Sequence, residues 1–209
     1  MKKLVKRSVL VTILCLLAVS NIQAMAATKK QLNSKALTEY KRVLEKGYYT
    51  YTSYGHTWKT ELKEFTIIDI NRDGIKEMIT RTSRYSQMDI WVLKGKKAAR
   101  ILSFMPYQGT SIGYSKKNKA LSYAISMTVT TDADGFIKMK SRTATNLFEY
   151  GTRWENGRSI PLWYINGKKV SSKTFKKKVN PKNFADVKEV LFYSNYVWNV
   201  NRLGKLKAY

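Results

Sequence analysis

The spacing of apolar residues along this chain changes near residue 48. Before that point, apolar side chains recur on one face of a helix, and Gly47 follows as a stop signal. These apolar residues are Leu32, Leu37, Tyr40, Val43 and Leu44. The pattern predicts an amphipathic helix over Thr28–Lys46, within an N-terminal helical segment formed by residues 27–47.

From residue 48 onward, short apolar runs alternate with turn residues, which is typical of consecutive antiparallel strands. The runs are residues 65–70, 77–82, 88–93, 99–104 and 120–130. We expect the last run to turn at Asp132–Gly135 into a further strand over residues 136–140. The predicted fold class is α+β, mostly β: an N-terminal helix followed by an antiparallel β-sheet of consecutive hairpins in residues 48–209.

The C-terminal part of the chain contains three further local signals. Asn166 and Gly167 are the favoured residues of a two-residue hairpin turn. Ser172–Lys178 is predicted to form a short basic helix. Val187–Tyr193 is predicted to form a strand or a buried helix.

The first 26 residues have the composition of a signal peptide. A basic start is followed by an apolar stretch over residues 9–19, and Ala24-Met25-Ala26 has the small-x-small pattern of a cleavage site. The apolar stretch is shorter than the roughly 20 residues of a membrane-spanning helix. The one cysteine, Cys15, lies within it and lacks a preceding lipobox. We therefore expect a secreted protein that begins at residue 27, is either released or held on the cell wall, and lacks a transmembrane anchor.

Acidic residues are scarce, with 14 Asp and Glu against 39 Lys and Arg, yet three lie within residues 69–77. Several oxygen ligands from one tight turn, with glycine at the bend, are the arrangement that Ca²⁺ prefers. The candidate metal ligands are Asp69, Asn71, Asp73, Ile75 (through its backbone carbonyl) and Glu77. We therefore expect a Ca²⁺ ion held by a loop between two strands.

The spacing of this loop differs from that of an EF-hand, because Thr80 stands where an EF-hand has its bidentate glutamate. It resembles instead the Asp-x-Asp/Asn-x-Asp-Gly-x-x-Asp/Glu calcium loops of integrin-type (FG-GAP-like or VCBS-like) repeat proteins. That resemblance implies a calcium cofactor but covers this loop alone. A propeller would need the unit repeated at a fixed period, and no second full copy is present.

The chain as a whole is similar to small secreted proteins of unknown function from Gram-positive bacteria. The segments that carry this resemblance are Phe65–Glu77, Trp91–Arg100, Ile165–Val170 and Phe192–Asn195. It implies an extracellular protein and supplies no catalytic residues.

The formal net charge of the chain is +25, and loss of the signal peptide would remove four basic residues. A charge of this size is either a solubilising surface or a match for polyanions. The candidate polyanion-binding residues are Lys168, Lys169, Lys173, Lys176, Lys177 and Lys178. The expected partners are anionic cell-wall polymers such as teichoic acid or an acidic glycan, with nucleic acid as a less favoured alternative.

Catalytic side chains are few. The single histidine, His56, excludes a zinc site built from two or three histidines. The enzyme that these residues permit is a secreted ribonuclease or phosphodiesterase, in which His56 would act together with Glu61 or Glu64 and with Arg81 or Arg84.

A binding function uses more of the sequence. Trp58, Trp154, Trp163 and Trp198 lie in polar, turn-rich contexts where an exposed ring can stack on sugars or bases, whereas Trp91 lies in an apolar strand. We therefore expect a calcium-structured, cationic, non-catalytic binder of anionic polymers. An adhesin or host-interaction protein is a further alternative.

Overall fold

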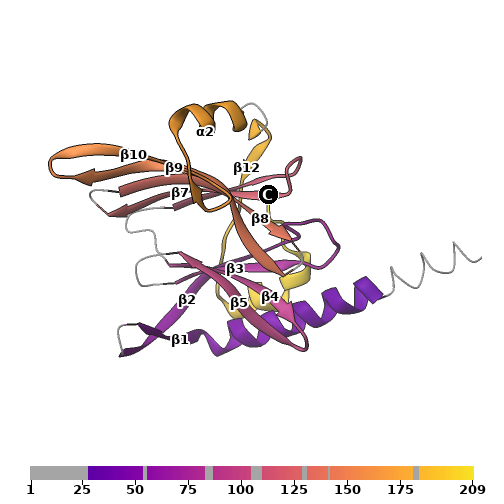
Figure 1. Cartoon of the computed structure of the whole chain (residues 1–209). Helices are drawn as coiled ribbons and strands as arrows, with labels where there is room; N and C mark the ends of the chain where they lie inside the picture. The colour runs from indigo at the N-terminus through magenta and orange to yellow at the C-terminus, as the bar shows by residue number, and fades with distance from the viewer. Residues whose placement is uncertain are drawn as a thin grey trace, which may run out of the picture.

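The computed structural model describes residues 28–53, 56–82, 87–104, 110–128, 131–140, 142–180 and 184–209. A helix over residues 28–46 leads into two antiparallel sheets, and Figure 1 shows four layers in succession. The helix lies against the first sheet, the second sheet covers the other face of the first, and helix α2 (Ser172–Lys178) lies above the second sheet. The α+β, mostly β fold with an N-terminal helix is therefore confirmed. The predicted signal peptide, residues 1–26, lies outside the described residues.

The first sheet has six strands within the described residues, in the order β1-β2-β3-β4-β5 with β13 paired to β2. Its strands are β1 (Tyr48–Ser53), β2 (His56–Ile68), β3 (Glu77–Thr82), β4 (Met88–Lys94), β5 (Lys97–Phe104) and β13 (Tyr193–Ser194). Consecutive strands pair as neighbours, as expected for hairpins. The calcium-type loop is the connection between β2 and β3.

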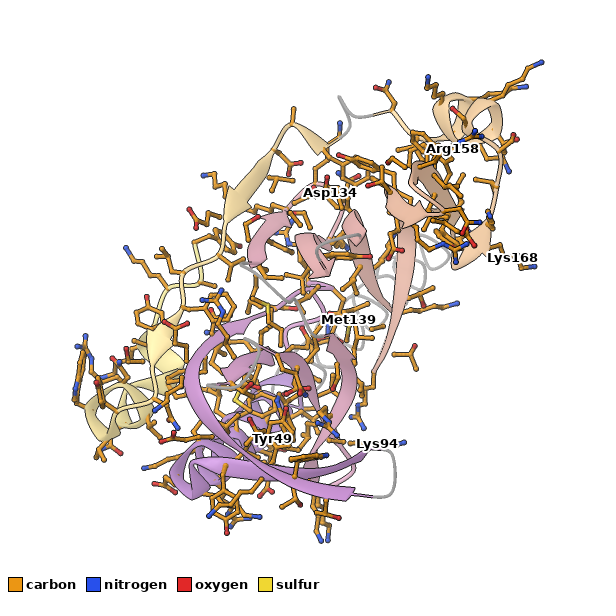
Figure 2. All side chains as sticks on the ribbon, turned by 90° about the vertical axis from the view of Figure 1, so that its left-hand side faces the viewer. Tyr49, Lys94, Asp134, Met139, Arg158 and Lys168 are labelled. Atoms are coloured by element: carbon orange, nitrogen blue, oxygen red, sulfur yellow. The ribbon has the colours of Figure 1, made fainter. Side chains whose placement is uncertain are left out.

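The second sheet has seven strands in the described part of the chain, in the order β11-β10-β9-β8-β7-β6-β12. Its strands are β6 (Thr110–Ser115), β7 (Ala120–Thr128), β8 (Thr131–Lys140), β9 (Thr143–Glu155), β10 (Arg158–Ile165), β11 (Lys168–Lys169) and β12 (Val187–Glu189). In Figure 2, Arg158 and Lys168 of this sheet lie near one end of the molecule and Tyr49 of the first sheet lies near the other.

Two local predictions are confirmed in this half of the chain. Helix α2 has the predicted bounds, and Asn166 and Gly167 both have positive φ (51° and 73°), as a type I′ hairpin turn requires. The segment Val187–Tyr193 forms no buried helix: it contributes β12 and the start of β13.

The prediction of a turn at Asp132–Gly135 is wrong, because these residues lie inside strand β8. Gly135 serves close packing: a Cβ there would overlap the Tyr123 ring and lie 2.8 Å from its Cε1 atom. The glycine signal therefore reflected a neighbour on β7 and not a change of chain direction.

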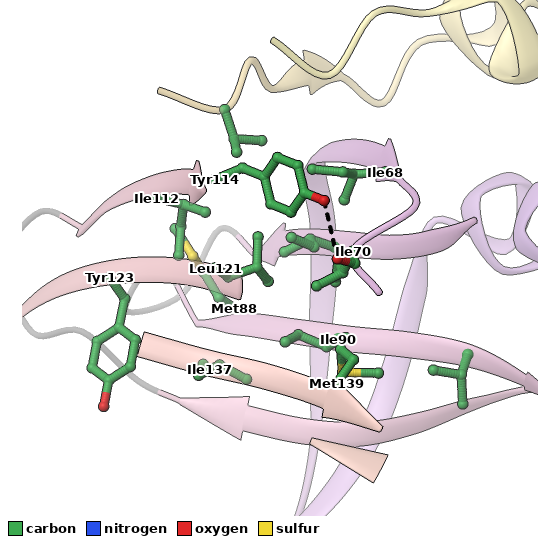
Figure 3. Close-up of a cluster of buried hydrophobic side chains, with 13 residues drawn as sticks. Ile68, Ile70, Met88, Ile90, Ile112, Tyr114, Leu121, Tyr123, Ile137 and Met139 are labelled. Atoms are coloured by element: carbon green, nitrogen blue, oxygen red, sulfur yellow. Dashed lines mark hydrogen bonds between the residues drawn. The ribbon is translucent and has the colours of Figure 1, made fainter. Parts of the chain in front are cut away.

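An apolar core joins the inner faces of the two sheets (Figure 3). Fully buried side chains from both sheets meet there, among them Ile79 and Ile90 from the first and Leu121 and Ile137 from the second. Because both sheets bury their apolar faces against each other, the loops at their edges stand on a rigid support.

A second core lies on the other face of the first sheet. There the leading helix contributes Ala36, Tyr40 and Leu44, all at most 2% exposed. The chain end closes this core with α3 (Val197–Asn201) and the 3₁₀ helix η2 (Leu203–Lys205), which bury Val200 and Leu203.

Candidate functional site

The loop between β2 and β3 is closed by its own acidic and amide side chains. Asp69 accepts hydrogen bonds from the backbone N–H groups of Asp73 (Oδ1, 3.0 Å) and Gly74 (Oδ2, 2.9 Å). Asn71 Oδ1 accepts from the same Asp73 N–H (2.9 Å), and Asp73 Oδ1 accepts from the Ile75 N–H (2.8 Å). These oxygens therefore all face the inside of one turn.

The backbone of the loop needs a glycine at its bend. Gly74 has φ = +92°, a conformation that a residue with a Cβ adopts only with strain, and Arg72 also has a positive φ of 59°. The glycine at this position thus has the role that the sequence pattern predicted for it.

Glu77 points into the loop. Its side chain is 3% exposed, and its Oε2 accepts a hydrogen bond from the Ile70 N–H at 2.8 Å. Burial, opposed by this hydrogen bond, raises the pKa of Glu77 to about 8, and the negative charges of Asp73 and Asp69 add to the shift. The carboxylate thus holds the backbone at the start of the loop.

Residues far along the chain hold the loop in place. Tyr40 in the leading helix donates to the Lys76 carbonyl (3.0 Å), and Asn33 Oδ1 accepts from the Lys76 N–H (2.9 Å). On the opposite side, Tyr114 in the second sheet donates to the Ile70 carbonyl (3.1 Å), as Figure 3 shows. These supports join three layers of the fold and carry no local sequence signal.

The donor set suits a hard cation, because it consists of carboxylate, amide and carbonyl oxygens. Across the described residues, however, no group of three or more His, Cys, Asp or Glu side chains is arranged to hold a metal ion. In the structure Asp69, Asp73 and Glu77 hold backbone amides of the loop. Calcium binding therefore stays a prediction.

A polar pocket of about 540 Å³ opens beside the loop. Asn71 and Asp73 contribute one part of its lining. The remaining lining comes from the turn between β6 and β7 and from the end of β8: Lys117, Asn118, Lys119, Lys138, Met139 and Lys140. Four lysine residues and one aspartate thus share the lining of this pocket.

The turn that carries Lys117 and Lys119 is held in place by hydrogen bonds to Asp186. Asp186 accepts hydrogen bonds from the Lys117 N–H (2.8 Å) and from the Ser115 hydroxyl (2.7 Å), and these bonds lower the pKa of Asp186. Ser115 Oγ in turn accepts from the Asn118 N–H (3.1 Å). These bonds go to backbone and short side chains, and both lysines of the turn, Lys117 and Lys119, are exposed.

The six lysines predicted to bind polyanions lie elsewhere. They are exposed on β11 and α2, and none belongs to the described lining of the polar pocket. The pocket lysines had no signal in the sequence, because they come from one turn and the end of one strand that only the pairing of β7 with β8 brings together.

The tryptophans divide much as predicted. Trp91 is 8% exposed in the core, whereas Trp58 and Trp198 are 38% and 61% exposed. Trp163 lines an aromatic cavity on the second sheet, and the Trp154 side chain lies outside the described part of the chain.

Of the residues proposed for a ribonuclease, the structure brings Glu64 and Arg81 together but separates Glu64 from His56. His56 begins β2 and Glu64 lies eight residues further along the same strand, so about 26 Å of extended chain separates them. Glu64 pairs with Arg81 (2.7 Å), whereas Glu61 pairs with Lys63 (2.8 Å). The His56 side chain and Arg84 lie outside the described residues. The backbone alone therefore argues against a shared site for His56 and Glu64.

No protein-family model, curated protein or solved structure matches this chain significantly. Among the described residues, no helix is both long and apolar enough to cross a membrane.

Proposed function

We propose that this protein is a secreted, non-catalytic binder of anionic surface polymers, such as teichoic acid or an acidic glycan, organised by a calcium loop. The observation that carries this proposal is the polar pocket beside the loop, whose lining includes Lys117, Lys119, Lys138 and Lys140 together with Asp73. Export is supported by the signal-peptide pattern of residues 1–26.

The pocket suits a repeating phosphate or carboxylate. Four lysine residues in the lining give the hollow a positive potential, which attracts an anion. Screening limits the attraction to about 8 Å at physiological salt, so charges at contact range dominate.

The loop would hold Ca²⁺ through the side chains of Asp69, Asn71, Asp73 and Glu77 and the carbonyl of Ile75. Bound there, the ion would supply positive charge that offsets the one carboxylate lining the pocket. We therefore expect polymer binding to be stronger with calcium than with a chelator.

The test is calorimetric titration of the secreted protein with purified teichoic acid over 50–200 mM salt. If the four lysines each displace one counterion, as on single-stranded nucleic acid, affinity should fall about 50-fold over this range. The variant Lys138→Gln/Lys140→Gln keeps two of the lysines, so its affinity should fall only about sevenfold over the same range.

The matched control is Lys94→Gln/Lys96→Gln, which removes two exposed lysines at the turn between β4 and β5. It lowers the net charge equally, so its binding should stay near that of the native chain. A Lys168→Gln/Lys169→Gln variant tests the other lysine surface. Equal losses in all three variants would reject a localised site, and binding that ignores salt would reject the electrostatic proposal.

A further inference from the structure

An aromatic cavity lies between α2 and the second sheet, apart from the calcium-type loop. Its volume is about 440 Å³, within the range of small-molecule sites. Six aromatic side chains line it: Phe136, Phe148, Tyr150, Trp163, Phe175 and Phe184. The walls are therefore almost entirely apolar.

The rings form a connected frame around the cavity. Phe148 lies edge-on to Phe175 (centroids 5.8 Å apart) and to Phe184 (5.0 Å). Trp163 lies 4.8 Å from Phe175 and stacks with Tyr150 at 6.2 Å. These pairs have the offset and edge-to-face geometries that aromatic side chains favour, so the cavity is bounded by mutually supported rings.

Helix α2 forms the roof and is attached by one buried side chain. Phe175 is 6% exposed and is the buried residue of this helix, whereas Tyr150 at the rim is 41% exposed. An apolar hollow is a poor site for water, because water there finds few hydrogen-bond partners. The cavity thus suits an apolar group that enters from solvent.

The polar groups of the lining select the ligand. They are the Lys176 ammonium and the Tyr150 hydroxyl, and burial together with the neighbouring Asp134 carboxylate raises the pKa of that hydroxyl. A sugar would bury many hydroxyl groups here without partners, which is costly. A hydrocarbon chain has no such cost.

Charge at the rim favours an anionic head group. Lys176 lines the cavity, and Lys173, Lys177 and Lys178 are exposed on the same helix. The carboxylate of Asp134, beside Tyr150, offsets the charge of one of these four lysines. A carboxylate or phosphate at the rim would therefore meet a net positive field.

We propose that this cavity binds a single acyl chain with an anionic head group, the chain among the aromatic rings and the head group at Lys176. The proposal is independent of calcium and of the polar pocket.

Titration of the full secreted chain with dodecanoate, with dodecanol as the uncharged analogue, tests this. We expect saturable one-to-one binding of dodecanoate. Lys176→Glu should lower the affinity for dodecanoate about five- to tenfold and leave dodecanol binding unchanged. An exposed ion pair contributes little to affinity, and reversing the charge of Lys176 doubles the effect of removing it. Lys177→Glu, the neighbouring exposed lysine that does not line the cavity, is the matched control.

A cavity-filling variant tests the apolar part. Val179→Trp places a large ring in the lining, at a half-buried residue with extended backbone. It should abolish binding of both ligands while the melting temperature stays native. Should this variant fail to fold, the comparison of Lys176→Glu with Lys177→Glu still decides. No saturable dodecanoate binding, or equal effects of the two lysine variants, would overturn the proposal.

Sedimentation with phosphatidylglycerol vesicles tests whether the bound acyl chain belongs to a membrane lipid or to a free fatty acid. Dodecanoate binding together with vesicle binding that is lost in Val179→Trp assigns an anionic membrane lipid. Dodecanoate binding without such vesicle binding assigns a free fatty acid.

Discussion

At the residue scale, one fully buried carboxylate organises the polar part of the first sheet. Asp89 is 0% exposed and accepts hydrogen bonds from Tyr49, Ser103 and Gln87, the last at 3.0 Å. Arg100 lies 3.6 Å away and supplies the opposite charge. Burial and the hydrogen bond to Asp89 raise the pKa of Tyr49, so its hydroxyl remains a donor at all physiological pH values.

Asp89→Ala should therefore destabilise the protein strongly. It leaves a guanidinium and three polar side chains without their shared partner, at a cost of about 3–5 kcal/mol. Urea unfolding measures the change. Glu155→Ala, which breaks an exposed pair with Arg153, should cost about 0.5 kcal/mol or less and serves as the control. Equal costs for both variants would contradict a structural role for the buried network.

Gly135 gives a second prediction at this scale. Gly135→Ala should cost about 1–3 kcal/mol, because its Cβ would overlap the Tyr123 ring. Tyr123→Leu removes the overlapping ring atoms, so the double variant should be more stable than the sum of the two single changes predicts. Strict additivity in the unfolding free energies would mean that the glycine has another role.

At the element scale, segments with local signals could be predicted from sequence. The bounds of α2 follow from a capping serine and a basic last turn: Ser171 accepts from the Thr174 N–H at 3.2 Å. The Asn166-Gly167 turn follows from the need for positive φ. By contrast, the role of Gly135 depends on a ring in the neighbouring strand, which no local pattern reveals.

Some residues of the candidate site could likewise be predicted from local sequence, and others could not. Asp69 and Glu77 could be identified because their spacing in one loop is itself the signal. The lysines at 117–119 and at 138–140 could not be grouped, because only the pairing of β7 with β8 places the two segments side by side. The aromatic cavity is likewise assembled from β8, β9, β10 and α2.

The loop between β2 and β3 gives the prediction for this scale. Because Ca²⁺ would bind the native loop alone, calcium at a hundredfold over Kd should add about 2.7 kcal/mol to the free energy of unfolding. For a chain of this size that raises the melting temperature by about 5–10 °C relative to EDTA. Glu77→Gln should abolish most of the calcium-dependent shift, and Glu64→Gln, outside the loop, should retain it. An equal melting temperature of the native chain in calcium and EDTA would reject the metal site.

At the scale of the whole molecule, the first sheet is shared by two apolar cores. Neighbouring residues on β3 serve different cores: Ile79 packs against the second sheet, and Met78 packs against the leading helix. Loss of either core would expose one face of the same sheet, so neither layer has a stable partner alone. The helix and the two sheets should therefore unfold together.

Two matched truncations test this cooperativity. Leu44→Ala opens the helix-side core and Leu121→Ala opens the core between the sheets; the two leucines are 2% and 0% exposed. Each should cost about 2–5 kcal/mol. Because the cores share one sheet, each variant should shift a single transition that far-ultraviolet and near-ultraviolet circular dichroism report at the same midpoint. In a contrary outcome, Leu44→Ala would release the helix at lower denaturant while the aromatic signal of the second sheet stayed native. The helix-side core and the core between the sheets would then belong to separate folding units. The polar pocket beside the calcium-type loop, lined by residues of both sheets, would then depend on their docking and not on one cooperative fold.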